Sequence, residues 1–344
     1  MQYGVERILT KMSYISSFFI LMMKKMKQRD TYVDVAKGIG IMLIVSIHTE
    51  VFGVMGYPLS FIAVPVFFFM SGFYDRAERN IGQWFPKSLR TLILPAIIWI
   101  LIATAYIKLL GYVKDRSWGE NPFNFYIMTG DNGPAWFLFA LLYAKVLTWG
   151  LMKIKMTKWA IWGGSLLIGY VGMNINMPLL FDEGCAALPL YVTGKLAYPY
   201  LRKITKNKGL FVAGVIALCL YLWHLASFTI VPQSNGDFAP YYLVALGLMF
   251  LCFVPFLFIS EKLQSQKWLV SLGQHSLGIM LLHAPMCHTA AVILNRVFEP
   301  ASLYWIVSFL IAYVCIVFVS YWGTVLIDRY IPIMLGKKSE NMKS

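Results

Sequence analysis

Long apolar runs separated by short polar stretches follow one another along almost the whole chain. Each run is close to the ~20 apolar residues that an α-helix needs to cross a bilayer. The pattern therefore predicts about ten transmembrane helices. Their expected limits are 36–56, 59–75, 89–110, 133–152, 158–175, 184–201, 209–230, 239–260, 275–295 and 302–328.

The composition assigns these helices to a membrane protein. Hydrophobic residues make up 59% of the chain, charged residues 13%, and the mean hydropathy is +0.65. A soluble globular protein carries about 25% charged residues. No long linker divides the chain, so we predict one all-α polytopic membrane domain over residues 26–330, with a basic cytoplasmic tail at 331–344. Internal prolines such as Pro65 and Pro255 are compatible with membrane helices, where neighbours satisfy the freed backbone groups.

Basic residues gather in alternate loops. They are Lys24, Lys25, Lys27, Arg29, Arg76, Arg79, Lys87, Lys153, Lys155, Lys158, Arg202, Lys203, Lys206, Lys208, Lys262, Lys267, Arg329, Lys337, Lys338 and Lys343. The opposite loops hold only Lys108, Lys114, Arg116 and Arg296. The positive-inside rule then predicts that both termini are cytoplasmic. The net charge of +14 reflects this topology, and we do not expect nucleic-acid binding.

The N-terminal extension, residues 1–25, is not predicted to span the membrane. Its apolar run from Ser13 to Met23 is about half the length needed. The charges of Lys24 and Lys25 follow this run instead of preceding it, which is unlike a signal peptide. Two interpretations stay open: an interfacial helix, or a native protein whose translation begins at Met26.

Several familiar chemistries have no support in the sequence. The cysteines stand singly in apolar segments, without metal-binding spacing, and are interpreted as reduced packing residues. Glycine-rich phosphate-binding loops and the H-E-x-x-H pattern are missing from the sequence. This argues against a nucleotide-driven pump and a zinc protease, and we expect no metal.

His48 is the most informative candidate, because it lies inside a continuous, almost wholly apolar stretch. An ionisable group at membrane depth usually marks a functional site. Lys37 stands eleven residues earlier, close to three helical turns, so both fall on one stripe about 16 Å apart. Asp34 lies one turn before Lys37. The alternative for His48 is a packing histidine bonded to a backbone carbonyl. Lys145 and Lys195 also fall inside predicted spans and either face a cavity or extend to the surface.

Four blocks in order resemble the acyltransferase-3 family of membrane O-acyltransferases. Lys37 and His48 match its Arg/Lys-x(10)-His pattern, and Pro65 to Phe73 resembles its P-x-F-F-x-x-S-G-F helix. Trp136-Phe137-Leu138 resembles its W-F-L segment, and Ser271 to His283 resembles its late L-G-x-x-S-L helix ending in histidine.

Within that family the first helix is similar to the fucose 4-O-acetylase-like branch, which shares D-x-A-K-G-I-G-I. Two departures concern the sugar acceptor. The branch often has a histidine just before P-x-F-F, where this chain reads Phe61-Ile62-Ala63-Val64. It usually has a basic residue directly before L-x-x-P, where this chain has Thr91, with Arg90 one residue earlier.

The resemblance implies a membrane O-acyltransferase in the inner (plasma) membrane of a bacterium. The donor would be acyl-CoA, with acetyl-CoA favoured, and the acceptor a hydroxyl of a cell-surface glycan or its lipid-linked precursor. Membrane lipids are the other expected partners, and a homodimer stays open. Histidine suits this chemistry either as base or as acyl carrier. A secondary transporter or lipid-sugar flippase is the rival reading, although we see no inverted repeats.

The resemblance also assigns roles to individual residues. The catalytic set is His48 with Asp34, the donor phosphates are expected at Lys37, Arg76 and Arg90, and Ser71, Trp136 and His283 are expected to line the substrate site. Each assignment has a plain alternative. Asp34 would instead pair with Lys37, and the arginines would only reflect topology. Ser71-Gly72 would allow close helix packing, and Trp136 would anchor the helix at the membrane interface.

Overall fold

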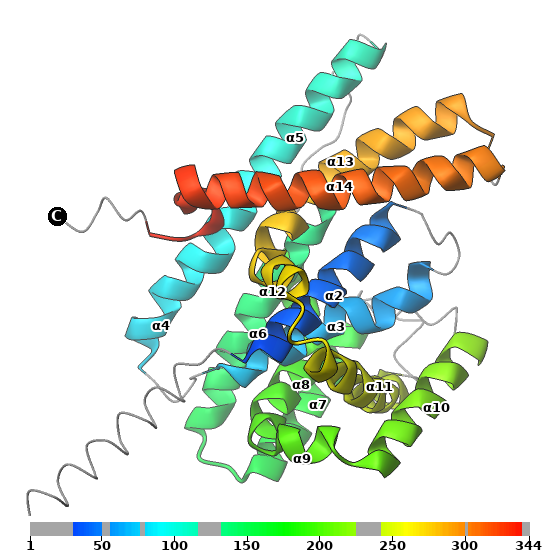
Figure 1. Ribbon diagram of the computed structural model, residues 1–344. Coiled ribbons are helices and arrows are strands. Elements are labelled where there is room, and N and C mark those ends of the chain that lie inside the picture. The colour runs from blue at the N-terminus through cyan, green and yellow to red at the C-terminus, as the bar shows by residue number, and fades with distance from the viewer. Residues whose placement is uncertain are drawn as a thin grey trace, which may run out of the picture.

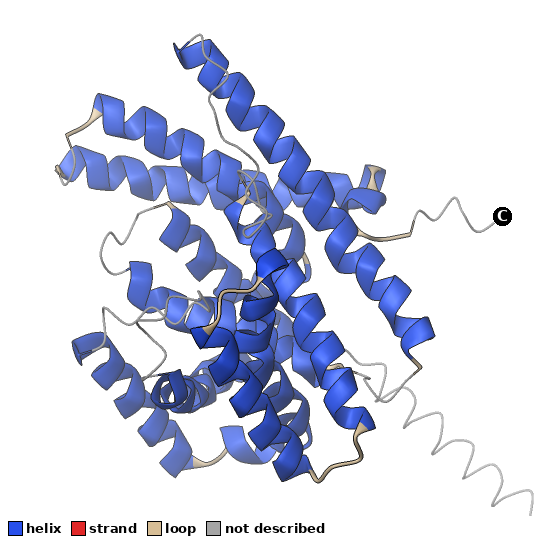
Figure 2. Cartoon of the chain, turned by 180° about the vertical axis from the view of Figure 1, so that it is seen from behind, coloured by secondary structure: helices blue, strands red, loops and turns tan. Residues whose placement is uncertain are grey.

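The computed structural model describes residues 30–49, 56–75, 80–115, 132–224, 242–299 and 302–338. These residues fold into packed helices, with no strand among them (Figures 1 and 2). The α-helices are α2 (Thr31–His48), α3 (Gly56–Phe73), α4 (Ile81–Ser88), α5 (Leu94–Asp115), α6 (Trp136–Lys153), α7 (Lys158–Asn174), α8 (Phe181–Ala197), α9 (Leu201–Thr205), α10 (Lys208–His224), α11 (Tyr242–Lys262), α12 (Lys267–Gln274), α13 (Ser276–Val297) and α14 (Leu303–Tyr330). Short 3-10 turns lie at η3 (Gly133–Ala135), η4 (Pro178–Leu180), η5 (Tyr198–Tyr200) and η7 (Pro332–Leu335), and η2 (Leu89–Ile93) is a π-helix.

Each of the ten predicted segments falls on a helix. Six helical segments within the described ranges are long and apolar enough to cross a membrane. The helices α7, α8 and α10 have 17 residues each and are shorter than a usual span. The all-helical membrane architecture is therefore confirmed, while the count of ten crossings and the cytoplasmic termini stay predictions. Residues 1–25 lie outside the described ranges.

The outer surface of the helices is apolar, as expected for a protein surrounded by lipid. The helix α14 packs on α13 (Figure 1). Most of its apolar side chains are exposed. Val314 is 63% exposed, and Phe318 62%. A patch of this kind would be unfavourable in water but faces hydrocarbon without cost.

The helix α2 lies at the centre and packs against α3, α11, α12, α13 and α14. Its crossing with α12 depends on two glycines. A Cβ atom on Gly38 would collide with the backbone of Leu269, and one on Gly273 would collide with the backbone of Asp34. Small residues allow this close backbone approach between membrane helices. The position of α2, and of the candidate residues that it carries, is thereby fixed.

The predicted span 89–110 begins earlier than expected. The side chain of Asn80 accepts a hydrogen bond from the Gly82 amide at 3.1 Å and starts α4 at Ile81. The apolar segment then continues through η2 into α5, over Ile81–Val113. Pro95 has no N–H to donate to the carbonyl group one turn earlier, and the π-turn η2 accommodates the lost hydrogen bond.

Candidate functional site

The helix α2 carries both Lys37 and His48 without a break. They stand about 16 Å apart along its axis, with Lys37 half-buried and His48 exposed. The expected limits 36–56 are corrected, because α2 begins at Thr31 and ends at His48. At its start Asp30 is extended, and at its end Thr49 leaves helical geometry (φ −90°, ψ 2°). His48 is therefore the last helical residue.

The helix α3 runs antiparallel to α2. At one end the Tyr74 hydroxyl donates to Asp30 Oδ2 at 3.4 Å, and at the other Phe67 shares a small hollow with His48. Ser71 is half-buried one turn beyond Phe67, so it lies between the levels of His48 and Lys37.

Gly72, next to Ser71, packs against α8. A Cβ atom there would collide with the carbonyl oxygen of Tyr191, and one on Gly194 would collide with the carbonyl oxygen of Phe69. The packing interpretation therefore holds for Gly72, while the lining role of Ser71 stays a prediction.

His48 and His283 form a pair of imidazoles at the centre of the candidate site. Their ring centroids are 5.1 Å apart, with the planes tilted by 55°. His283 comes from α13 and is completely buried. Its Nδ1 lies 3.0 Å from the carbonyl oxygen of Ile279, and its Nε2 has no hydrogen-bond partner within the described residues.

A hollow of about 30 Å³ opens beside His48. Its lining residues are Ile44, His48, Val64, Phe67, Pro134, Trp136, Phe137 and Met280. The predicted residues His48 and Trp136 thus meet here, with His283 against His48. The volume has room for little more than water, so a sugar must displace side chains or approach His48 from its exposed side.

Asn132, which the sequence analysis missed, ties the start of α6 to α13. Pro285 has no N–H, so the carbonyl oxygen of Leu281 loses its usual donor inside α13. The Asn132 Nδ2 atom donates to that oxygen at 3.1 Å and also contacts the carbonyl oxygen of Trp99 at 3.4 Å. Both partners accept only, which fixes the amide orientation. Its Oδ1 is buried, with no hydrogen-bond partner in the described part of the chain.

Asp34 lies at the other end of α2, about 21 Å from His48 along the axis. It is 1% exposed and accepts a hydrogen bond from Gln274 Nε2 at 3.2 Å. At that separation its carboxylate cannot exchange a proton directly with His48. The geometry favours an anchoring role at the crossing of α2 and α12, and the predicted catalytic role receives no support from it.

The structure describes one of the two arginines predicted to bind donor phosphates. Arg76 lies outside the described residues. Arg90 is in η2, where the backbone of Gly336 packs closely against it, and its Nε is buried with no hydrogen-bond partner among the residues described. The helices that pack against α2 are α3, α11, α12, α13 and α14, whereas η2 packs against α4, α5 and α6. Arg90 is therefore not on an element that packs extensively against α2, and its role in binding the donor phosphates stays a prediction.

Lys195 and Lys145 take part in buried polar contacts. The Lys195 Nζ lies 3.5 Å from Asp75 Oδ2 and donates to the Asp75 carbonyl oxygen at 3.1 Å, with both side chains nearly inaccessible. The Lys145 Nζ donates to Ser88 Oγ at 2.8 Å and lies 5.1 Å from the ring centre of Trp84. Neither lysine simply extends to the surface, as one of the sequence interpretations allowed.

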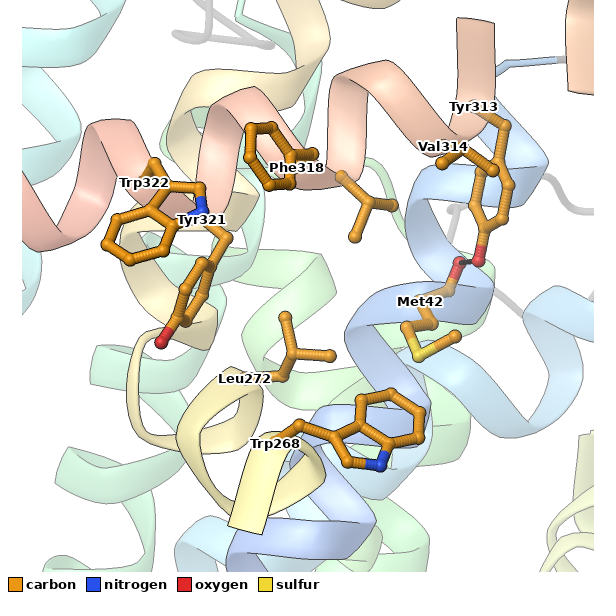
Figure 3. A pocket seen from close by; sticks show the side chains of 9 residues that line it. Met42, Trp268, Leu272, Tyr313, Val314, Phe318, Tyr321 and Trp322 are labelled. Carbon is orange, nitrogen blue, oxygen red and sulfur yellow. Dashed lines mark hydrogen bonds between the residues drawn. The ribbon is translucent and has the colours of Figure 1, made fainter. Parts of the chain in front are cut away.

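A larger pocket of about 390 Å³ lies on a different face of α2, between α2, α12 and α14 (Figure 3). Its lining residues are Met42, Trp268, Leu272, Tyr313, Val314, Val317, Phe318, Tyr321 and Trp322. The tyrosine hydroxyls are already engaged: Tyr313 donates to the Met42 carbonyl oxygen at 3.3 Å, and Tyr321 bonds Ser271 Oγ at 2.7 Å. The pocket offers no acid or base and is not the candidate catalytic site.

The cysteines carry no evident chemistry. All five are free; Cys185, Cys252 and Cys287 are buried, whereas Cys219 and Cys315 are exposed. Within the described ranges, no three His, Cys, Asp or Glu side chains gather closely enough to hold a metal ion.

Comparison with known protein families gives a match over most of the chain. The acyltransferase-3 family model, described as an acyltransferase domain, matches residues 30–329. No curated protein and no solved structure matches the chain significantly. The match does not distinguish branches of the family, so the likeness to the fucose 4-O-acetylase-like branch rests on the first-helix motif.

Proposed function

Because this chain belongs to the acyltransferase-3 family, we propose that it transfers an acyl group from cytosolic acyl-CoA to a glycan hydroxyl. It is a multi-pass membrane acyltransferase. The observation that carries the proposal is His48, exposed at a hollow shared with Trp136 and backed by His283. The acceptor in this proposal is a cell-surface glycan or its lipid-linked precursor, and the membrane is the bacterial inner membrane.

The chemistry needs one group that titrates near neutrality. Attack of a hydroxyl on a thioester is faster when a base removes the hydroxyl proton, and histidine has a suitable intrinsic pKa. His48 alternatively takes the acyl group itself and then passes it to the hydroxyl. The rings of Trp136 and His48 line the same hollow, which supports a role for Trp136 in closing the site around the reacting atoms.

The donor is proposed to enter from the cytoplasmic end of α2. The ammonium group of Lys37 would bind a coenzyme A phosphate, and the pantetheine arm would extend about 16 Å along α2 to His48. Half-buried Ser71 lies between these two levels and would line the path. The small volume beside His48, about 30 Å³, supports a short acyl group, and we propose acetyl-CoA as the donor.

The acceptor is proposed to reach His48 from the opposite side of the membrane, or laterally if it is lipid-linked. The exposed face of His48 supports this, because donor and acceptor would then approach one residue from different directions. Membrane lipid is proposed to cover α14 and the apolar pocket between α2, α12 and α14, whose lining is aromatic and aliphatic.

The test uses purified full-length protein in proteoliposomes with acetyl-CoA and bacterial surface glycan as acceptor. We expect release of free coenzyme A thiol that depends on the acceptor, with the acetyl group recovered on a glycan hydroxyl. Empty liposomes control for spontaneous hydrolysis. Acceptor-independent release only, or sugar flux across the bilayer without acetyl-CoA, would overturn the proposal, and the flux would favour the transporter.

A second expected result concerns the donor site. Lys37→Ala should weaken acyl-CoA binding about tenfold or more, since a hydrogen bond to a charged group contributes about 1.5–3 kcal/mol. Acceptor affinity should change little. Isothermal titration calorimetry with acetyl-CoA measures the difference, and Lys262→Ala, an exposed cation at the end of α11, is the control. Equal affinity in wild type and Lys37→Ala would reassign Lys37 to a structural pair with Asp34.

A further inference from the structure

We propose that His283 is a positioning residue whose Nε2 accepts a hydrogen bond from a ring N–H of His48. This bond would fix the tautomer of His48, so that its other ring nitrogen carries a lone pair toward the substrate. The inference rests on the proposed function of His48 and replaces the substrate-lining role predicted for His283.

The protonation pattern of His283 follows from its contacts. The carbonyl oxygen of Ile279 can only accept, so the Nδ1 atom, 3.0 Å away, carries the hydrogen. In the neutral ring Nε2 is then an acceptor, and it is buried with no hydrogen-bond partner within the described ranges. A buried polar atom left unsatisfied is costly, so a nearby donor is expected.

His48 is placed to be that donor. Two imidazoles joined by one N–H···N bond of about 3 Å have ring centres about 5 Å apart. The rings of His48 and His283 have centroids separated by 5.1 Å. The proposal requires the His48 side chain, which is at the end of its helix, to turn so that one N–H points at His283 Nε2.

The difference in exposure decides which of the two rings contacts the substrate. His48 is exposed and lines the hollow, whereas His283 is 0% exposed and does not line it. A substrate in the hollow therefore meets His48, and His283 acts through His48. The arrangement resembles the logic of a catalytic base held in one tautomer by a third group.

Asn132 keeps His283 in place from outside its own helix. Its Nδ2 donates at 3.1 Å to the carbonyl oxygen of Leu281, which Pro285 has left without a donor. Leu281 is two residues from His283, so this bond fixes the part of α13 that carries the ring. In the same part of α13, a Cβ atom on Gly278 would collide with the side chain of Thr324 in α14.

In the proposed step, the lone pair of His48 takes the proton of the acceptor hydroxyl. The hydroxyl oxygen forms a bond to the thioester carbon, the carbon–sulfur bond breaks, and the leaving thiolate receives that proton from His48. While His48 is protonated, its N–H bond to His283 becomes charge-assisted and therefore stronger. The positioning bond thus stabilises the charged state that the reaction requires.

The test compares His283→Leu with His283→Gln, because glutamine keeps an acceptor oxygen and leucine does not. In the acetyl-CoA assay we expect kcat of His283→Leu to fall about tenfold, the equivalent of one hydrogen bond, with both KM values unchanged. His283→Gln should recover a large part of kcat. His288→Leu, an exposed histidine on the same helix, is the matched control and should behave as wild type.

Nitrogen-15 NMR of histidine-labelled protein gives a readout that does not depend on acyl transfer. We expect one His48 tautomer in wild type and a mixture in His283→Leu, with the His48 signal assigned from His48→Ala. Equal kcat in the leucine and glutamine variants, a raised acceptor KM, or an unchanged tautomer would each overturn the positioning role. A wild type that shows one tautomer but no transfer would instead contradict the proposed function.

Discussion

His48→Ala is expected to lower acyl transfer by about 100-fold or more, the usual scale for loss of a general base or nucleophile. Among the described residues, no other ionisable side chain lines the hollow beside it, and His283 is too deeply buried to take its place. His48 is exposed and ends α2, so the variant should express and fold. The measurement is acceptor-dependent transfer from radiolabelled acetyl-CoA in membranes, normalised to protein amount.

The control for this experiment is His288→Ala, an exposed histidine outside the hollow, which should retain normal transfer. Near-normal transfer by His48→Ala would exclude His48 both as base and as acyl carrier. Those two mechanisms are separated by mass spectrometry of wild type incubated with acetyl-CoA alone. An acetyl group on His48 would favour the carrier, and an unmodified His48 under these conditions would favour the base.

The helices could be predicted from the sequence because the apolar runs are long and the family blocks are ordered. Their ends could not. The segment 89–110 begins at Ile81 because Asn80 caps α4 through its side chain, and a π-turn carries the helix past Pro95. A hydropathy profile detects neither the capping hydrogen bond nor the π-turn, because both depend on where individual hydrogen bonds are made.

The candidate site could be predicted in part. Spacing places Lys37 and His48 on one helix, and the family blocks point to Trp136 and His283. Asn132 could not be identified, because an asparagine before a helix is ordinarily read as a cap. The informative signal was Pro285: a proline inside a helix frees a carbonyl group, which then needs a donor from elsewhere. Which segment supplies it depends on tertiary packing.

The sequence also does not show which residues are the partners of the buried charged side chains. Lys195 stands out inside an apolar segment, but the sequence does not show that Asp75, at the end of α3, is its partner. The family pattern likewise does not show that Asp34 is bonded to Gln274 about 21 Å from His48. A charged residue in a membrane segment is thus a good indication of a partner and a weak indication of which partner.

Lys195→Met is expected to destabilise the folded protein by about 3–5 kcal/mol, because it leaves the Asp75 carboxylate buried without its cation. The side chains of Lys195 and Asp75 are 9% and 0% exposed, and water cannot replace the lost charge. The free energy of unfolding, measured with denaturant in detergent micelles, should fall by that amount. Adding Asp75→Asn should recover most of the loss, because the double variant buries no unpaired charge.

A matched control separates the effect of burial from the mere presence of an ion pair. Lys337 and Asp328 form a closer pair, at 2.6 Å, but their side chains are 51% and 27% exposed. Surface pairs contribute about 0–1 kcal/mol, so Lys337→Met should change stability by no more than that. If Lys195→Met were no more destabilising than Lys337→Met, Asp75 would have to be neutral in the folded protein. The contacts of Lys195 would then be hydrogen bonds and not an ion pair.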